Sequence, residues 1–110
     1  MGVIRKCEAW FMEGDKKHEM AFEKLNIREA PECGEEGESY IDGKGSDVWG
    51  AFTFEGYVNL THMSFSAVKK HKEFNMFFQG EVNSTFTELK GFWGWGHGLE
   101  EGDFLIKQIE

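Results

Sequence analysis

Apolar and polar residues alternate along most of this chain, which is the pattern of a β-strand that buries one face. The clearest same-face sets are Val48, Phe52, Phe54 and Val58; Met63, Phe65 and Ala67; and Phe74, Met76, Phe78 and Val82. No window of about 12 residues has the spacing of apolar residues that an amphipathic helix requires. The pattern therefore predicts an all-β protein.

About eight strands are predicted, near residues 4–12, 19–27, 38–42, 47–58, 61–69, 73–82, 85–94 and 102–109. Turn-forming residues separate them at 13–16 and at 43–47. Tight reversals are predicted at 58–60 and 82–84, where Asn59 and Asn83 tolerate a positive φ. This spacing is typical of consecutive hairpins, and no segment remains for the crossover helix of a parallel sheet.

Glycine and phenylalanine are unusually frequent, at fourteen and eleven of 110 residues, beside a single proline. The glycines that fall inside predicted strands are Gly50, Gly56, Gly80, Gly91 and Gly94. Glycine in a strand often marks a bulge or bend, and repeated bends let a sheet close and lose its exposed edges. We therefore predict an antiparallel meander closed into a small β-barrel, a single domain over residues 1–110, with a two-sheet β-sandwich as the alternative.

The charge and the termini narrow the classes of partner. Twenty acidic and twelve basic residues give a formal net charge of −8, which opposes binding to the phosphate backbone of nucleic acid. No apolar run has the length of a signal peptide or a membrane span, so we expect no membrane association and a cytoplasmic location. Cys7 and Cys33 are too few for a disulfide scaffold; we expect two reduced thiols, with a single bridge as the alternative.

Two charged segments are interpreted as solvated. Residues 28–47 carry seven acidic residues against Arg28 and Lys44, together with the only proline, and predict a loop followed by a short strand. Residues 69–72 read Lys-Lys-His-Lys at a predicted hairpin tip. Such a run is most simply a turn that keeps the flanking apolar strands soluble.

Signatures of catalysis and metal binding are absent from the sequence. The histidines His18, His62, His71 and His97 have no ligand-pair spacing, and no nucleophile, phosphate or dinucleotide motif occurs. We therefore expect a non-enzymatic protein with no catalytic residue, no metal and no cofactor. A small-barrel isomerase or cyclase is the enzymatic alternative.

The most unusual stretch is residues 91–98, where aromatic residues alternate with glycine and end at His97. Trp93 and Trp95 project to one face of a strand, so they can form the wall of a pocket with His97 at its rim, or they can plug the end of the barrel. The candidate ligand-binding residues are Trp93, Trp95, His97, Trp49, Tyr57 and Trp10. If the Phe-rich face is the core, Trp49 and Tyr57 lie outside it.

The chain resembles the calycin-type small barrels, the avidin-like and lipocalin-like proteins. The resemblance lies in the eight-strand meander and in strand punctuation such as Gly50-Ala51-Phe52 and Gly91-Phe92-Trp93. Glu8-Ala9-Trp10 stands where lipocalins carry Gly-x-Trp, and the helical lid of fatty-acid-binding proteins has no counterpart. Avidin-like barrels are nearer in length and strand count, and they enclose their ligand with tryptophan. The resemblance implies a barrel that binds a small molecule.

Two functions follow as hypotheses. The first is binding of a small apolar or aromatic ligand by the tryptophans and His97. The second is a protein-interaction or homodimer surface, because Trp49, Tyr57 and Phe77 lie off the Phe-rich face.

Overall fold

The computed structural model describes residues 2–4, 6–29, 38–96 and 100–109. All the regular elements in these ranges are strands. They are β1 (Gly2–Ile4), β2 (Cys7–Glu13), β3 (Lys16–Glu19), β4 (Ala21–Glu29), β5 (Glu38–Asp47), β6 (Gly50–Asn59), β7 (Ser64–Lys70), β8 (Asn75–Val82), β9 (Glu88–Gly94) and β10 (Gly102–Gln108). The described residues contain no helix that could span a membrane.

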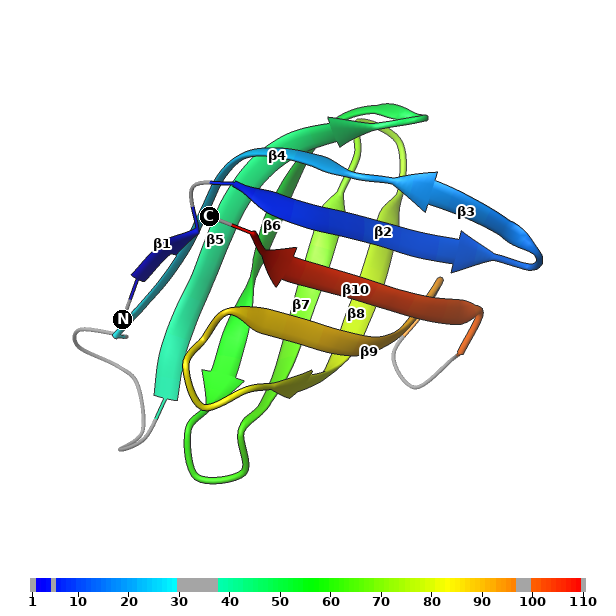
Figure 1. Ribbon diagram of the computed structural model, residues 1–110. Coiled ribbons are helices and arrows are strands. Elements are labelled where there is room, and N and C mark those ends of the chain that lie inside the picture. The colour runs from blue at the N-terminus through cyan, green and yellow to red at the C-terminus, as the bar shows by residue number, and fades with distance from the viewer. Residues whose placement is uncertain (1, 5, 30–37, 97–99, 110) are drawn as a thin grey trace.

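The strands form one antiparallel sheet that curls into a nearly closed barrel (Figure 1). The order in the sheet is β1-β4-β5-β6-β7-β8-β9-β10-β2-β3. Residues 16–29 bring its two ends together, because β3 pairs with β2 while β4, its continuation, pairs with β5. At the junction, the Met20 amide donates to the Ala9 carbonyl at 2.9 Å. The prediction of an all-β antiparallel barrel is confirmed, and the sandwich alternative is wrong because the strands form one sheet.

Phenylalanine rings from opposite walls fill the centre of the barrel. Phe78 contacts Phe104, Phe54 and Phe11, with ring centroids 4.9, 5.6 and 6.5 Å apart. All four side chains are almost completely buried. The period-two sets predicted around Phe54, Phe65 and Phe78 therefore do supply the core, as the burial of alternate residues shows.

Two of the in-strand glycines allow neighbouring strands to approach closely. Gly80 of β8 lies opposite Gly91 of β9, and a Cβ atom on Gly80 would collide with the Lys90 carbonyl. Gly56 of β6 is equally confined, since its Cβ would collide with the Ser66 carbonyl. These positions therefore require glycine for space, in agreement with strands that bend as the sheet closes.

The turn predicted at residues 43–47 is wrong, because these residues form the second half of β5. Gly45 lies where β4 passes close by, and a Cβ there would collide with the Ala21 carbonyl, so the glycine serves strand packing and not reversal. The reversal falls at Val48 and Trp49 instead. Val48, predicted on the core face, is 63% exposed in this turn.

The two asparagine reversals are present, but for a different reason from the predicted one. Among the described residues other than glycine, those with positive φ are Met63 (51°) and Phe86 (58°). Asn59 instead accepts the Thr61 amide with its side-chain oxygen at 2.9 Å, and Asn83 accepts two backbone amides at the start of the next strand in the same way. The asparagines thus stabilise the turns through side-chain hydrogen bonds.

The first predicted strand and the acidic segment are also revised. Residues 4–12 are not one strand, since β1 pairs with β4 whereas β2 pairs with β10. The acidic segment is strand from Glu38 to Asp47, and its residues 30–37, with Cys33, lie outside the described residues. Cys7 forms no disulfide in the described part of the chain, and burial raises the pKa of its thiol.

Candidate functional site

A buried ion pair lies at the end of the barrel where the β5–β6 turn and the β7–β8 connection meet (Figure 1). The Lys69 ammonium is 2.5 Å from the Asp47 carboxylate, and neither side chain is exposed. His71 Nε2 lies 3.0 Å from the same carboxylate oxygen, Oδ2, with 2% of the side chain exposed. The prediction that residues 69–72 form a solvated turn is therefore wrong for Lys69 and His71, which continue the inward-facing positions of β7.

Aromatic rings surround the Lys69 ammonium on its other sides. Its Nζ atom is 4.0 Å from the ring centroid of Phe11, 5.0 Å from Phe52 and 5.4 Å from Phe78, and it lies 3.5 Å from the Met20 sulfur. Burial lowers the pKa of Lys69 to about 8, against the opposing effect of the Asp47 hydrogen bond and charge. At neutral pH the amine is therefore a buried cation, held by one carboxylate and by ring faces.

Only one of the two ring nitrogens of His71 has a hydrogen-bond partner. Nε2 faces Asp47, whereas Nδ1 is buried and has no hydrogen-bond partner. The ring stacks on Phe74 with centroids 4.6 Å apart, which fixes its orientation. Most buried polar atoms in folded proteins are hydrogen bonded. Among the described side chains, Ser39 Oγ is a second exception.

Aromatic side chains cover this end of the barrel, and we call them the aromatic mouth: Phe11, His18, Trp49, Phe74 and Trp95. The Trp49 ring lies 5.2–6.4 Å from the other four, measured between centroids. Trp49 is nevertheless 38% exposed and Trp95 is 44% exposed. The mouth therefore presents two large aromatic surfaces to solvent on a base of packed rings.

Trp93 and Trp95 behave differently although they project to the same side of β9 and its extension. Trp93 is buried and donates its indole N–H to the Met12 carbonyl at 2.7 Å, so it is part of the barrel interior. The Trp95 ring lies 5.1 Å from it, edge to face, and reaches the mouth. The remaining residue predicted in this stretch, His97, lies outside the described residues.

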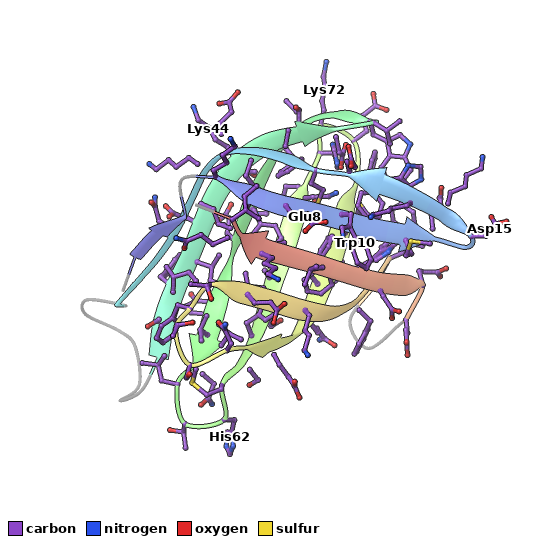
Figure 2. All side chains as sticks on the ribbon, in the orientation of Figure 1. Glu8, Trp10, Asp15, Lys44, His62 and Lys72 are labelled. Carbon is purple, nitrogen blue, oxygen red and sulfur yellow. The ribbon has the colours of Figure 1, made fainter. Side chains whose placement is uncertain are left out.

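The structure brings Trp49, Trp93 and Trp95 together and separates Tyr57 and Trp10 from them. Trp49 does not lie on the outer wall, as the alternation predicted, because its turn folds over the end of the barrel. Tyr57 does lie outside, half exposed, with its ring 4.9 Å from Tyr40. Trp10 lies on the outer face of β2 (Figure 2), with the Lys17 ammonium 5.1 Å from its ring centroid.

Trp10 belongs to a second candidate site, an apolar groove on the outer face of β8, β9, β10 and β2. Trp10, Phe92 and Leu105 supply its apolar surface, and the paired glycines Gly80 and Gly91 leave the space. The hollow has a volume of about 530 Å³. Its charged residues are Glu81, Lys90 and Asp103. We call it the outer groove.

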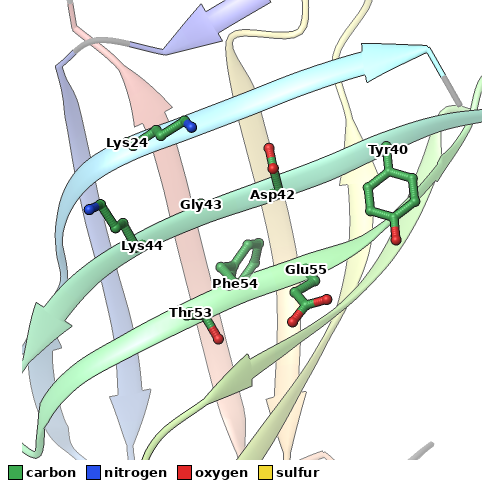
Figure 3. Close-up of a pocket in the computed structure, with 8 residues that line it drawn as sticks. All are labelled: Lys24, Tyr40, Asp42, Gly43, Lys44, Thr53, Phe54 and Glu55. Carbon is green, nitrogen blue, oxygen red and sulfur yellow. The ribbon is translucent and has the colours of Figure 1, made fainter. Parts of the chain in front are cut away.

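Another groove of about 510 Å³ lies on the outside of β4, β5 and β6 (Figure 3). It is lined by charged and polar side chains, among them Lys24, Tyr40, Asp42 and Glu55. Asn26 and Asp42 are hydrogen bonded beside it at 3.3 Å. Side chains of both charges alternate here, as is usual on the face of a sheet that is exposed to solvent. This mixture does not indicate one class of ligand.

Metal binding has no support in the described part of the chain, which holds no group of three histidine, cysteine or acidic side chains placed for an ion. No family model, curated protein or solved structure matches this chain. The resemblance to calycin-type barrels thus extends to the nearly closed antiparallel barrel and stops there. The functional argument rests on the geometry alone.

Sequence reasoning missed Asp47, Lys69 and His71, the three residues of the buried ion cluster. One signal was available, since the period of two that makes Phe65 and Ala67 inward continues to residues 69 and 71. On β5, Asp47 is an even number of positions from the apolar Ile41, so the same period of two places both residues on the inward face. Charged residues are rarely buried, so a charged residue at an inward-facing position of a strand can be recognised from the alternation as an unusual one.

Proposed function

We propose that the protein binds a small, flat aromatic or apolar molecule across the aromatic mouth. The observation that carries the proposal is the exposure of Trp49 and Trp95, two large rings whose neighbouring rings are packed. The Phe rings around Phe78 fill the barrel centre, so the ligand would lie on the mouth and not deep inside. Tryptophan suits such contacts because it offers a large flat surface with few rotatable bonds.

The buried ion cluster gives this mouth a fixed shape. Asp47 Oδ1 accepts the Trp49 backbone amide at 2.9 Å, while its Oδ2 atom holds Lys69 and His71. The turn that carries Trp49 is therefore tied to a carboxylate that cannot easily move. A ring already held in its binding position loses less conformational entropy when a ligand arrives.

The test is a titration with N-phenyl-1-naphthylamine, an uncharged aromatic probe whose emission rises in apolar surroundings. We expect saturable binding, with quenching of tryptophan emission by energy transfer. Trp49→Ala and Trp95→Ala each remove an exposed ring surface and should weaken the binding at least about fivefold. Trp10→Ala is the matched control because Trp10 lies on the outer face of β2.

Two results would contradict the proposal. One is a probe titration that does not saturate with the wild-type chain. The other is loss of binding in Trp10→Ala with no change in Trp49→Ala, which would place the probe in the outer groove. Far-ultraviolet circular dichroism and the unfolding midpoint of each variant would show that the barrel remains folded.

The outer groove favours a second candidate function, association of two copies of this chain. Apolar Trp10, Phe92 and Leu105 lie between acidic residues and Lys90, so a two-fold arrangement can place Lys90 of each copy against an acidic residue of the other. Apolar surface bordered by charge is typical of interfaces.

Sedimentation velocity across a range of concentrations tests this association. We expect a dimer that Leu105→Lys converts to monomer, because a charge in the apolar centre would be buried without a partner. Tyr57→Ser, on the outer face of β6, should leave the dimer intact. A wild-type chain that stays monomeric at high concentration would exclude this function.

A further inference from the structure

The buried ion pair places the amine of Lys69 directly against the carboxyl group of Asp47. We propose that these two side chains react with each other, so that the Lys69 Nζ atom becomes bonded to the Asp47 Cγ atom in an amide and one water molecule is released. The product is a covalent link between the end of β5 and β7, within a single chain. This modification is independent of the ligand at the aromatic mouth and of the dimer.

The two reacting groups are held in contact by the folded barrel. Nζ lies 2.5 Å from Oδ2, and Cγ is one covalent bond beyond that oxygen. Neither side chain is exposed, so bulk water does not compete for either group. Well-oriented groups within one molecule react as if each were present at about 10⁵–10⁸ M. Such proximity favours an amide that free amines and carboxylates in water do not form.

Attack on the carboxyl carbon requires a neutral amine, and the surroundings of Lys69 favour that form. The ring centroids of Phe11, Phe52 and Phe78 lie 4.0, 5.0 and 5.4 Å from Nζ. Burial lowers the pKa of Lys69 to about 8. Apolar surroundings disfavour separated charges, so transfer of a proton from Nζ to Oδ2 leaves an uncharged amine beside an uncharged carboxyl group.

The two oxygens of Asp47 have different partners, and each partner suits one step of the reaction. Oδ1 accepts the Trp49 backbone amide at 2.9 Å, a donor that stabilises the negative charge developing on this oxygen when Nζ attacks Cγ. Oδ2 lies 3.0 Å from His71 Nε2, and the stacking of this ring on Phe74 fixes its orientation. His71 is therefore placed to transfer a proton to the departing oxygen.

The reaction balances without any further reactant. The Lys69 ammonium gives one proton to Oδ2, and the lone pair of Nζ then bonds to Cγ while an electron pair of the carbonyl bond moves to Oδ1. Nζ releases a second proton, which the unprotonated Nε2 atom of His71 receives and returns to Oδ2. Oδ2 leaves as water with the electron pair of its bond to Cγ, and Oδ1 regains its double bond. One hydrogen remains on the amide nitrogen.

The mass of the intact chain, followed while the purified protein is incubated at pH 8, tests the proposal. We expect the wild type to become lighter by one water molecule. Lys69→Met lacks the amine and should keep the full mass of its sequence. Lys70→Met, at the exposed neighbouring lysine, is the matched control and should lose water as the wild type does. His71→Phe should react at least about a hundredfold more slowly.

Proteolysis then locates the new bond. In the unreacted chain, residues 47 and 69 fall in one tryptic peptide, residues 45–69. An amide at Lys69 prevents cleavage after this residue, so the peptide should extend to residue 70 and lack one water. Chymotrypsin cuts at the aromatic residues between the two positions, and it should leave the fragments that contain Asp47 and Lys69 joined. A cyclic imide at an aspartate would also lose water but would leave these fragments separate.

The proposal is overturned if the folded wild type keeps its full mass, if Lys69→Met also loses water, or if the chymotryptic fragments separate. An unchanged rate in His71→Phe would exclude the proton transfer by His71. Circular dichroism of each variant shows whether the barrel is retained. A chain of full mass still holds the ion pair, so the pKa of Lys69 and the stability effects of the pair are measured on such chains.

Discussion

Asp47→Ala lowers the free energy of unfolding by about 3–5 kcal/mol, the range found when one partner of a buried ion pair is removed. The reason is that the Lys69 ammonium stays enclosed by the Phe11, Phe52 and Phe78 rings without its carboxylate. Stabilities of domains this size are about 5–15 kcal/mol, so the variant loses a large fraction of its margin. Urea denaturation followed by tryptophan emission measures the change.

A double variant separates the ion pair from other roles of Asp47. Asp47→Leu combined with Lys69→Met replaces both charges with apolar groups, and we expect it to be more stable than Asp47→Ala alone. Lys107→Met, at an exposed position, should change the stability by less than about 0.5 kcal/mol. Strictly additive effects of the two single changes would show that the two side chains do not interact.

The alternation of apolar and polar residues predicted the fold well. It follows from the geometry of a single strand and the burial of one of its faces, so it can be recognised within a short stretch of sequence. The residues on either side of Phe54 are the polar Thr53 and Glu55, so the apolar set on the other face identified the core, although Phe77 beside Phe78 departs from this pattern. Glycine was ambiguous, since a turn and a close approach of strands both require it. Gly45 was therefore assigned to a turn, although the constraint comes from Ala21 of β4, which lies 24 residues earlier in the chain.

Alternation places Lys69 on the inward face, but its pairing with Asp47 could not be predicted, because only the closed barrel brings the two side chains together. Burying Lys69 alone is strongly unfavourable, so a run of basic residues is normally assigned to solvent. The carboxylate that makes it tolerable is 22 positions away, at the end of β5. Neither position identifies the other in the sequence, and the distance between them follows from the pairing of β5 with β6 and of β6 with β7.

The predicted position of Trp49, on the outer wall of the barrel, was wrong for a related reason. Counting by twos from Phe52 places residue 49 on the outer wall, but this count holds only while the strand continues. The strand that holds Phe52 begins only at Gly50, and Trp49 lies in the turn that follows β5. The carboxylate of Asp47, at the end of β5, accepts the Trp49 amide and directs the turn over the barrel end. Side chains in turns do not follow the alternation of the adjoining strands, so the mouth required the three-dimensional structure.

The contribution of Lys69 to stability should increase as the pH rises from about 8 to about 10.5. Burial lowers the pKa of Lys69 in the folded chain to about 8, whereas an unfolded lysine titrates near 10.5. Between these values the unfolded chain holds a proton that the folded chain has released, so the free energy of unfolding rises with pH. The full difference corresponds to on the order of 3 kcal/mol and is reached above pH 10.5.

Other groups also titrate in this range, and growing negative charge opposes folding. The measured quantity is therefore the difference in unfolding free energy between the wild type and Lys69→Met, taken from urea denaturation at several pH values from 7 to 11 (about one unit apart). Lys107→Met should track the wild type throughout. A difference that stays flat across the range would mean that Lys69 titrates in the folded chain as it does in the unfolded one. A carbon-13 titration of the Lys69 side chain, with its midpoint near pH 8, gives an independent measurement of the same pKa.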